Sequence, residues 1–319
     1  MENFKGWEDL HLVRTRIDHA IHRTPVLTSE TLNKDAGAKL FFKCENFQKT
    51  GSFKARGAAN FVFSLSQEEA AKGVATHSSG NHGAALARAA ALRGITAHII
   101  MPNNSPATKQ ETVRRYGGKL TLCDPTYEAR KLACAKIIQE TGATLAHSAD
   151  DYRIIGGQGT TGLEFTEQVP DLDLILAPIG GGGMASGLVV AMKTLNLRTE
   201  VIAVEPEQAD DAFQSWKTGV LQPPEPNTVA DGLRTGLAEQ PFRILQAGAS
   251  EIVTVSEAAI VAAMQRIWKV LKIVVEPSAA VPYAAILEGK ITVQNRRIGV
   301  VLTGGNLDLT KLPWVTQLV

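Results

Sequence analysis

Residues 41–58 read FFKCENFQKTGSFKARGA. The first half of this stretch has the alternating pattern of a buried strand, and residues 50–52 then turn the chain. Ser52 is predicted to cap a helix whose face carries a small or apolar residue every four positions. Lys54 therefore falls in the first turn of a helix, where the positive end of the macrodipole disfavours a further cation.

A lysine in that position has little structural value. It suits an amine that must lose its proton near neutral pH in order to form a Schiff base. Most lysines are exposed surface residues, so the rest of the sequence has to supply independent support for a chemical role of Lys54.

The bulk composition is that of an ordinary globular protein. With 319 residues the chain is long enough for two domains. Its net charge of +1 gives no indication of nucleic acid or an acidic membrane as partner. The three cysteines lack metal-binding spacing and predict buried thiols. No apolar run approaches the roughly 20 residues that span a bilayer, and the first residues lack the apolar segment of a signal peptide, so a cytoplasmic location is expected.

Strands and helices alternate in two series, which predicts parallel sheets with helices on their faces. The first series has strands at 74–76, 97–101, 120–122 and 144–146, and the second has strands at 174–179, 201–204 and 298–302. The predicted fold class is α/β, with two three-layer domains and mostly parallel sheets. Residues 73–147 are predicted to form a small domain, and residues 1–72 plus 148–319 a discontinuous large domain.

Three junctions between a strand and a loop contain more polar or glycine residues than a turn requires. Residues 76–83 read THSSGNHG and follow a predicted strand, at the edge where parallel sheets bind ligands. Residues 180–183 are four glycines between a strand and a helix, where backbone N–H groups can converge on a phosphate. Neither a Walker lysine nor a dinucleotide-binding acidic residue accompanies them. Residues 303–306 read TGGN and follow the last strand.

A Schiff-base lysine, a phosphate-binding loop and polar loops together suggest pyridoxal 5′-phosphate. On these motifs the chain resembles the fold-type II pyridoxal-phosphate enzymes of the serine/threonine dehydratase, serine racemase and 3-hydroxyaspartate ammonia-lyase group. The matching segments are KCE (43–45), TGSFKARG (50–57), SSGNHG (78–83), GGGGM (180–184) and TGGN (303–306). The resemblance implies a tryptophan synthase β-like fold with the cofactor in the cleft between the two domains.

The resemblance also implies a role for individual residues. Lys54 would hold the cofactor as a Schiff base and take the Cα proton, and Ser79 would be the second catalytic group on the opposite face. Thr303 would bond the ring nitrogen with a neutral hydroxyl, which favours β-elimination over transamination. The implied cofactor contacts are Phe53, Lys54, Asn81, Gly180, Gly181, Gly182, Gly183, Met184 and Thr303. The implied substrate contacts are Ser78, Ser79, Asn81, His82, Arg130, Arg234 and Thr235.

Residues 205–211 read EPEQADD, an acidic loop after a predicted strand. A solvated helix start is one interpretation. The resemblance implies instead a divalent-cation site with the carboxylates of Glu205 and Asp211 and the carbonyl of Ala209. Such all-oxygen ligands suit Mg²⁺, or else Ca²⁺ or Mn²⁺, rather than zinc.

The sequence departs from its relatives at two positions. Ala149 replaces an asparagine that contacts the cofactor in relatives, and Ala84 replaces a glutamine found in relatives that bind ATP between subunits. The remaining candidates for a nucleotide site are Lys49, Thr50, Tyr116 and Lys272.

The predicted activity is the β-elimination of a small β-hydroxy amino acid, giving a 2-oxo acid and ammonia. Serine, threonine and 3-hydroxyaspartate are the candidate substrates, and Arg234 favours the last because it can pair with a β-carboxylate. One alternative is a serine or aspartate-type racemase that uses Lys54 and Ser79 as its two bases. Another is a pyridoxal-phosphate-binding protein without turnover. A homodimer with a small-molecule substrate is expected.

Overall fold

The larger of two β-sheets contains six strands. The computed structural model describes residues 7–78 and 80–314, and in it this sheet has the strand order β1-β2-β10-β7-β8-β9. β1 is antiparallel to β2, and the other neighbouring strands are parallel. The strands are β1 (Val26–Leu27), β2 (Lys39–Cys44), β7 (Leu174–Pro178), β8 (Glu200–Pro206), β9 (Glu251–Val255) and β10 (Arg297–Leu302).

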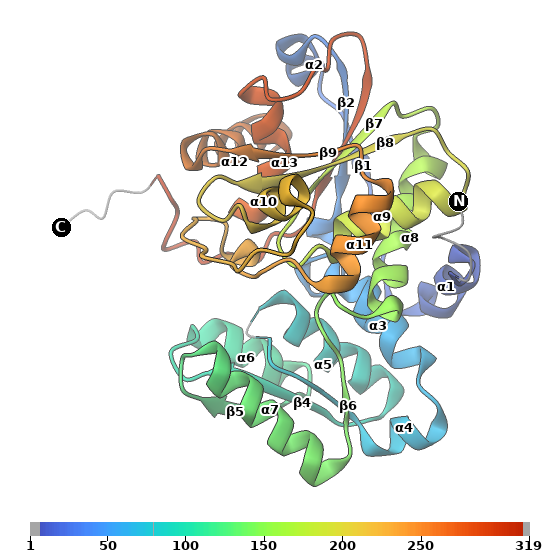
Figure 1. The fold of residues 1–319 in the computed structure, drawn as a ribbon, viewed down its shortest axis with the longest axis vertical. Helices are drawn as coiled ribbons and strands as arrows, with labels where there is room; N and C mark the ends of the chain where they lie inside the picture. Colours follow the sequence, from blue (N-terminus) through green and yellow to red (C-terminus); the bar gives the residue numbers. More distant parts are fainter. Residues whose placement is uncertain (1–6, 79, 315–319) are drawn as a thin grey trace, which may run out of the picture.

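Helices cover both faces of this sheet. Successive residues of β10 enter two different cores: Val300 and Leu302 pack with α12 and α13, whereas Val301 packs with α8 and α9. Figure 1 shows these two helix layers on opposite sides of the strands. The helices of this part of the chain are α1 (Leu10–Ile17), α2 (Glu30–Ala36), α3 (Lys54–Ser64), α4 (Gln67–Lys72), α8 (Tyr152–Gln168), α9 (Gly183–Thr194), α10 (Asp211–Thr218), α11 (Glu239–Gly248), α12 (Glu257–Leu271) and α13 (Pro277–Leu287).

The smaller sheet is parallel throughout and has the strand order β5-β4-β3-β6. Its strands are β3 (Val74–Thr76), β4 (Ala97–Pro102), β5 (Lys119–Cys123) and β6 (Thr144–Leu145), and its helices are α5 (Asn81–Arg93), α6 (Ala107–Arg115) and α7 (Tyr127–Thr141). It forms the lower part of Figure 1. The predicted α/β class with two mostly parallel sheets is confirmed. The domain boundaries at 72/73 and 147/148 stay a prediction, and they lie beside the ends of α4 and β6.

The helix α8 packs against α3 and α9 at backbone distance. A Cβ atom on Gly157 would lie 2.6 Å from the Cα of Gly57 in α3, and one on Gly187 in α9 would lie 2.7 Å from the backbone nitrogen of Gly159. Such close approach requires glycine on both helices. The helices expected from the sequence do not include residues 152–168, whose four glycines and three threonines are poor helix formers.

The predicted cap of α3 is wrong. Phe53 occupies the N-cap position, and the buried hydroxyl of Ser52 has no hydrogen-bond partner within the described residues. The backbone of Ser52 is extended and forms an isolated antiparallel bridge with Gly304. The backbone of Ser52 therefore still pairs in the manner of a β-strand, and the helix begins two residues later, at Lys54.

A buried cluster of four charged side chains joins α3 to β2, to the turn after β2 and to α8. The Arg56 guanidinium donates to Glu45 at 2.8 Å and to Glu164 at 3.1 Å, and the Lys43 amine donates to Glu164 and to the carbonyl oxygen of Thr24. These four charged side chains are almost completely buried. Burial opposes ionisation of Glu45, but Arg56 outweighs this effect and holds the pKa of Glu45 below its ordinary value. Two cations and two anions thus balance inside the fold.

No helix in the described ranges combines the length and apolar character needed to cross a bilayer.

We expect Arg56→Met to lower the free energy of unfolding by about 3–5 kcal/mol, because it leaves the buried carboxylate of Glu45 without its ion-pair partner and that of Glu164 with Lys43 alone. Urea unfolding followed by tryptophan fluorescence measures this. Arg243→Met is the control, since Arg243 forms an exposed pair with Glu239 on α11 that is worth about 0.5 kcal/mol or less. An equal effect of the two substitutions would contradict the importance of the buried cluster.

Candidate active site

Lys54 is the first residue of α3, and its side chain reaches the segment that follows β6. Its Nζ donates a hydrogen bond of 2.8 Å to the carbonyl oxygen of Ser148. Burial lowers the pKa of Lys54 to about 8, and the nearby carboxyl of Glu276 opposes this only in part. An amine of this kind is partly neutral at physiological pH and can attack a carbonyl carbon.

The glycine loop, residues 180–184, leads from β7 into α9. Gly182 has φ of 85°, and a Cβ atom on it would lie 2.5 Å from the Cβ of Pro241. The backbone N–H groups of the loop donate to no acceptor in the described part of the chain, although four of its five residues are buried. Unpaired N–H groups at the start of a helix bind anions, so the loop fits a phosphate group.

Residues 148 and 149 connect Lys54 with the glycine loop. Ser148 accepts the hydrogen bond from Lys54. The Cβ of the next residue, Ala149, lies 3.1 Å from the position that a Cβ on Gly181 would occupy. The amine and the phosphate-binding loop therefore belong to one site. Ala149 is buried there and offers no polar side-chain contact.

Two other predicted cofactor contacts approach from separate loops. Thr303 follows β10, and its carbonyl oxygen accepts a 3.0 Å hydrogen bond from the backbone N–H of Phe53. This bond ties Thr303 to the residue before Lys54. The Thr303 hydroxyl bonds to no other described residue and is available to a ring nitrogen. Asn81 begins α5, and its side-chain amide bonds to Glu276 and Asn306.

The loop after β3 supplies fewer side-chain contacts than predicted. Ser79 lies outside the described residues, so its catalytic role stays a prediction. The neutral His82 ring lies with Nε2 3.0 Å from the carbonyl oxygen of Ala146, and burial lowers the pKa of His82 to about 3. Nε2 of this buried ring is engaged by Ala146, and Nδ1 has no partner within the described residues. A substrate contact from the N–H of His82 at the start of α5 would come from its backbone. Ser78 is partly buried beside it.

The two predicted substrate arginines differ in their surroundings. Arg234 donates from Nε and Nη2 to the carbonyl oxygen of Thr228, at 2.8 and 2.6 Å, so two of its five N–H groups are used within its own loop. The guanidinium of Arg130, in α7, lies 5.6 Å from the ring centre of Tyr127 and has no hydrogen bond or ion pair with another described residue. Thr235 lies against the glycine loop, with Cγ2 3.1 Å from the Cβ position of Gly180.

Two carboxylates of the acidic loop, those of Glu205 and Asp211, are buried rather than solvated. Glu205 is 1% and Asp211 5% exposed, and burial raises the pKa of both, that of Glu205 to about 9. Glu205 accepts from the backbone N–H of Phe213 and Asp211 from that of Leu237. No basic side chain in the described ranges pairs with either carboxylate, and the carbonyl oxygen of Ala209 accepts no backbone hydrogen bond there. Two buried carboxylates without a counter-charge fit a divalent cation.

Within the described residues, no three His, Cys, Asp or Glu side chains are grouped as metal ligands. The predicted set has only two carboxylates and one carbonyl oxygen. Such a site would complete its coordination with water, as Mg²⁺ sites in proteins do.

Glu276 is a site residue that sequence reasoning missed. It precedes Pro277 at the start of α13, and in the sequence VEPS it resembles an ordinary helix-start residue. In the structure its buried carboxyl faces Asn81 and Asn306, and burial raises its pKa to about 7. No local pattern in the sequence indicates this, because its partners lie 195 and 30 residues away.

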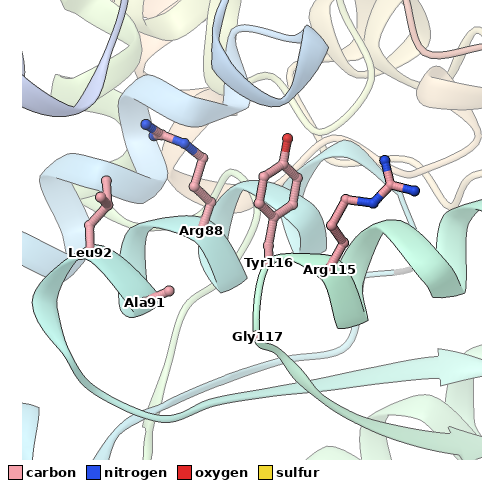
Figure 2. Close-up of a pocket in the computed structure, with 6 residues that line it drawn as sticks. All are labelled: Arg88, Ala91, Leu92, Arg115, Tyr116 and Gly117. Carbon is pink, nitrogen blue, oxygen red and sulfur yellow. The ribbon is translucent and has the colours of Figure 1, made fainter.

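A separate cavity of about 380 Å³ lies between α5 and the segment that follows α6. Figure 2 shows the polar ends of Arg88, Tyr116 and Arg115 pointing to one side of these helices. None of the predicted cofactor contacts lines this cavity. Tyr116 is one of the residues considered above for a nucleotide, and such a site stays a prediction.

Known proteins resemble the chain over nearly its whole length. A model of the family "pyridoxal-phosphate dependent enzyme" matches residues 17–304. A beta-hydroxyaspartate dehydratase of Paracoccus denitrificans is 52% identical, covering 97% of this chain and 98% of the relative. The structure of maize serine racemase superposes with a TM-score of 0.92 and 44% identity, covering 94% and 93% of the two chains. The structure of a pyridoxal 5′-phosphate-dependent aspartate racemase superposes with a TM-score of 0.90 and 36% identity, covering 96% of this chain and 97% of the racemase chain. The chain therefore belongs to the family of pyridoxal-phosphate-dependent enzymes.

Proposed function

We propose that this enzyme is an ammonia-lyase that converts 3-hydroxyaspartate into a 2-oxo acid and ammonia. The observation that carries the proposal is the partly buried Lys54 amine beside a glycine loop with unpaired N–H groups. The 52% identity to a beta-hydroxyaspartate dehydratase supports the choice of substrate. Serine and threonine carry the same leaving group and are the other candidates.

Several residues would hold the cofactor. The N–H groups of residues 180–184 would bind the phosphate, with Met184 at the start of α9. Phe53 would pack on the ring, Asn81 would donate to its oxygen and the Thr303 hydroxyl would bond its nitrogen. A hydroxyl carries no charge and does not keep the nitrogen protonated, which favours loss of a β-substituent.

The proton transfer is assigned to Lys54. When bound, pyridoxal phosphate withdraws electrons from the α-carbon of the attached amino acid and weakens its C–H bond. Nζ of Lys54 accepts this proton, and the carbonyl oxygen of Ser148 orients the amine. The β-hydroxyl takes up a proton and leaves as water, and the released enamine is hydrolysed to the 2-oxo acid and ammonia.

The substrate's β-carboxylate is assigned to Arg130. Its guanidinium has no hydrogen-bond partner or acidic partner among the described residues, whereas two N–H groups of Arg234 are held by the carbonyl oxygen of Thr228. His77, which precedes the loop with Ser78, contacts the Tyr127 ring on which Arg130 lies. This contact supports the assignment of Arg130 to the same substrate as the loop that follows β3, where Ser78, Asn81 and the backbone of His82 are assigned to the α-carboxylate.

Racemisation is the second candidate activity. It is supported by the similarity to a serine racemase and an aspartate racemase over more than 90% of the chain. Ser79 would then return a proton to the opposite face of the α-carbon. Elimination and racemisation begin with the same loss of the Cα proton, so one enzyme can catalyse both.

The proposal includes a divalent cation at Glu205, Asp211 and the carbonyl of Ala209, with Mg²⁺ as the first choice. It also includes a homodimer in the cytoplasm. The three free cysteines, Cys44, Cys123 and Cys134, suit a reducing compartment.

We expect Arg130→Gln to lower kcat/KM for 3-hydroxyaspartate by about 10–100-fold while changing that for serine little, because a charged hydrogen bond to the β-carboxylate is lost. Release of ammonia from the 3-hydroxyaspartate isomers, L-serine, D-serine and L-threonine measures this. Arg234→Gln is the matched control and should not discriminate between substrates. If Arg234→Gln instead lowers kcat/KM selectively for 3-hydroxyaspartate, the β-carboxylate is bound by Arg234 and not by Arg130. No ammonia from any substrate with the native enzyme would reject the function.

The rate at which the cofactor-free protein takes up pyridoxal phosphate should rise with pH and level off above about 8. Lys54 is protonated below its pKa of about 8 and only the neutral amine attacks the aldehyde. Stopped-flow absorbance measures the rate, with Lys54→Ala as the control that forms no covalent product. An exposed lysine has a pKa of about 10.4, so a rate that keeps rising to pH 10 would contradict the burial of this amine.

Mg²⁺ or Ca²⁺ at a hundredfold excess over Kd should stabilise the enzyme by about 2.7 kcal/mol. Glu205→Gln and Asp211→Asn should each abolish the rise in melting temperature. Asp210→Asn is the control, because the Asp210 carboxylate already accepts a 2.7 Å hydrogen bond from Gln214. A rise that survives in both ligand variants would place the cation elsewhere.

A further inference from the structure

The buried carboxyl of Glu276 accepts hydrogen bonds from two different loops. Its Oε1 accepts from Nδ2 of Asn81 at 3.0 Å, and its Oε2 accepts from the backbone N–H of Asn306 at 3.1 Å. Its own N–H donates to the carbonyl oxygen of Gly304 at 3.0 Å. The residue is only 4% exposed, and no basic side chain within the described ranges forms a salt bridge with it.

A local structural role does not account for this carboxyl. Glu276 occupies the N-cap position of α13, yet its side chain makes no cap hydrogen bond with that helix. Burying a carboxyl without a cationic partner is unfavourable, so we expect the Glu276 side chain to serve a role outside α13 that offsets this cost. Its hydrogen bonds point to Asn81 and the TGGN segment, both of which belong to the cofactor site.

Two glycines leave the space that this arrangement needs. A Cβ atom on Gly304 would lie 2.6 Å from Oε1 of Glu276, and one on Gly51 would lie 2.3 Å from Oδ1 of Asn306. The glycines of TGS (50–52) and TGGN (303–306) thus make room for the side chains of Glu276 and Asn306. This explains residues in both motifs that have no direct contact with a cofactor.

The hydrogen bonds determine the orientation of both amides. The carbonyl oxygen of Thr50 can only accept, so the Asn306 atom 2.7 Å from it is Nδ2. The same Nδ2 lies 2.9 Å from the Asn81 side chain, whose facing atom must therefore be the acceptor Oδ1. This leaves Nδ2 of Asn81 directed at Glu276, which as a carboxylate accepts.

One of the two side-chain N–H groups of Asn81 makes no hydrogen bond with a described residue. Its Nδ2 lies 3.0 and 3.3 Å from the two carboxylate oxygens of Glu276, a geometry in which one hydrogen is shared between both oxygens. The second hydrogen on Nδ2 is then free, and its direction is set by the first.

We propose that Glu276 is a positioning residue, which through Asn306 and Thr50 fixes the Asn81 amide so that its free N–H is aimed at the ring oxygen of the cofactor. This inference rests on the proposed contact between Asn81 and the cofactor ring. Glu276 itself touches neither cofactor nor substrate.

Glu276→Gln tests the proposal, because a glutamine offers one acceptor and one donor to two N–H groups that both require an acceptor. One of the two bonds must break, which either releases the Asn81 amide directly or releases Asn306, whose side chain holds the Asn81 oxygen. We expect the dissociation constant of pyridoxal phosphate to rise about tenfold, the loss of one hydrogen bond to a charged group, and the absorption band of the bound cofactor to shift. Fluorescence titration and absorbance spectroscopy without substrate measure these effects.

The double variant Glu276→Gln/Asn81→Asp separates positioning from stability. Its glutamine amide can donate to the new carboxylate, so the hydrogen-bond pattern is complete again, but the side chain of residue 81 no longer has an N–H group. We expect the melting temperature of the cofactor-free protein to recover toward that of the native protein, while cofactor affinity and spectrum remain altered. Recovery of affinity and spectrum together with stability would overturn the proposal, since it would show that a complete network alone suffices.

Glu257→Gln is the matched control. Glu257 is a partly buried carboxylate on α12 that accepts a 2.7 Å hydrogen bond from the backbone N–H of Val229. Its substitution should leave cofactor affinity and spectrum unchanged. If Glu276→Gln likewise lowers only the melting temperature, the positioning role is rejected. Because these measurements use no substrate, a failure to release ammonia would reject the proposed reaction without affecting this result.

Discussion

The balance of four buried charges around Arg56 determines where the rest of the site can lie. Glu45 comes from the turn after β2 and Glu164 from α8, so their bonds to Arg56 fix α3 against both elements. Residues two positions apart on a helix point about 200° apart. Because Arg56 is held in the interior, Lys54 is directed to the opposite side of α3, toward Ser148. The charge cluster thus sets the direction of the Lys54 side chain without contacting it.

Local patterns in the sequence carried enough information to find the centre of this site. The strand and the following turn in residues 41–58 placed Lys54 at the start of a helix, and the structure has α3 beginning at Lys54. Four consecutive glycines between a strand and a helix have few uses other than bringing N–H groups to an anion. The regular alternation of strands and helices likewise predicted both parallel sheets, because each apolar strand needs cover on two faces.

What could not be predicted depends on contacts between distant residues. α8 has the glycines of a loop, and it is helical because Gly157 and Gly159 let α3 and α9 approach it closely. Glu276 meets Asn81 across 195 residues, and Arg234 is engaged by the carbonyl of Thr228, a partner that no side-chain pattern reveals. Ser52 has the residue type of a helix cap, but its backbone pairing with Gly304 keeps it extended. In each case tertiary contacts outweigh local preference.

The residues assigned to the cofactor and those assigned to the substrate lie mostly beside different sheets. Lys54, the glycine loop and Thr303 belong to elements of the larger sheet, whereas Arg130 lies on α7 and Asn81 on α5, beside the smaller one. Under the proposed assignment of Arg130, a substitution on α7 would alter the charge offered to a substrate without disturbing the amine or the phosphate-binding loop. This arrangement fits a family in which the serine racemase and aspartate racemase structures both superpose on this chain with TM-scores of 0.90 or more. If cofactor chemistry and recognition of the β-substituent reside on separate elements, relatives can change substrate while they keep the residues around Lys54.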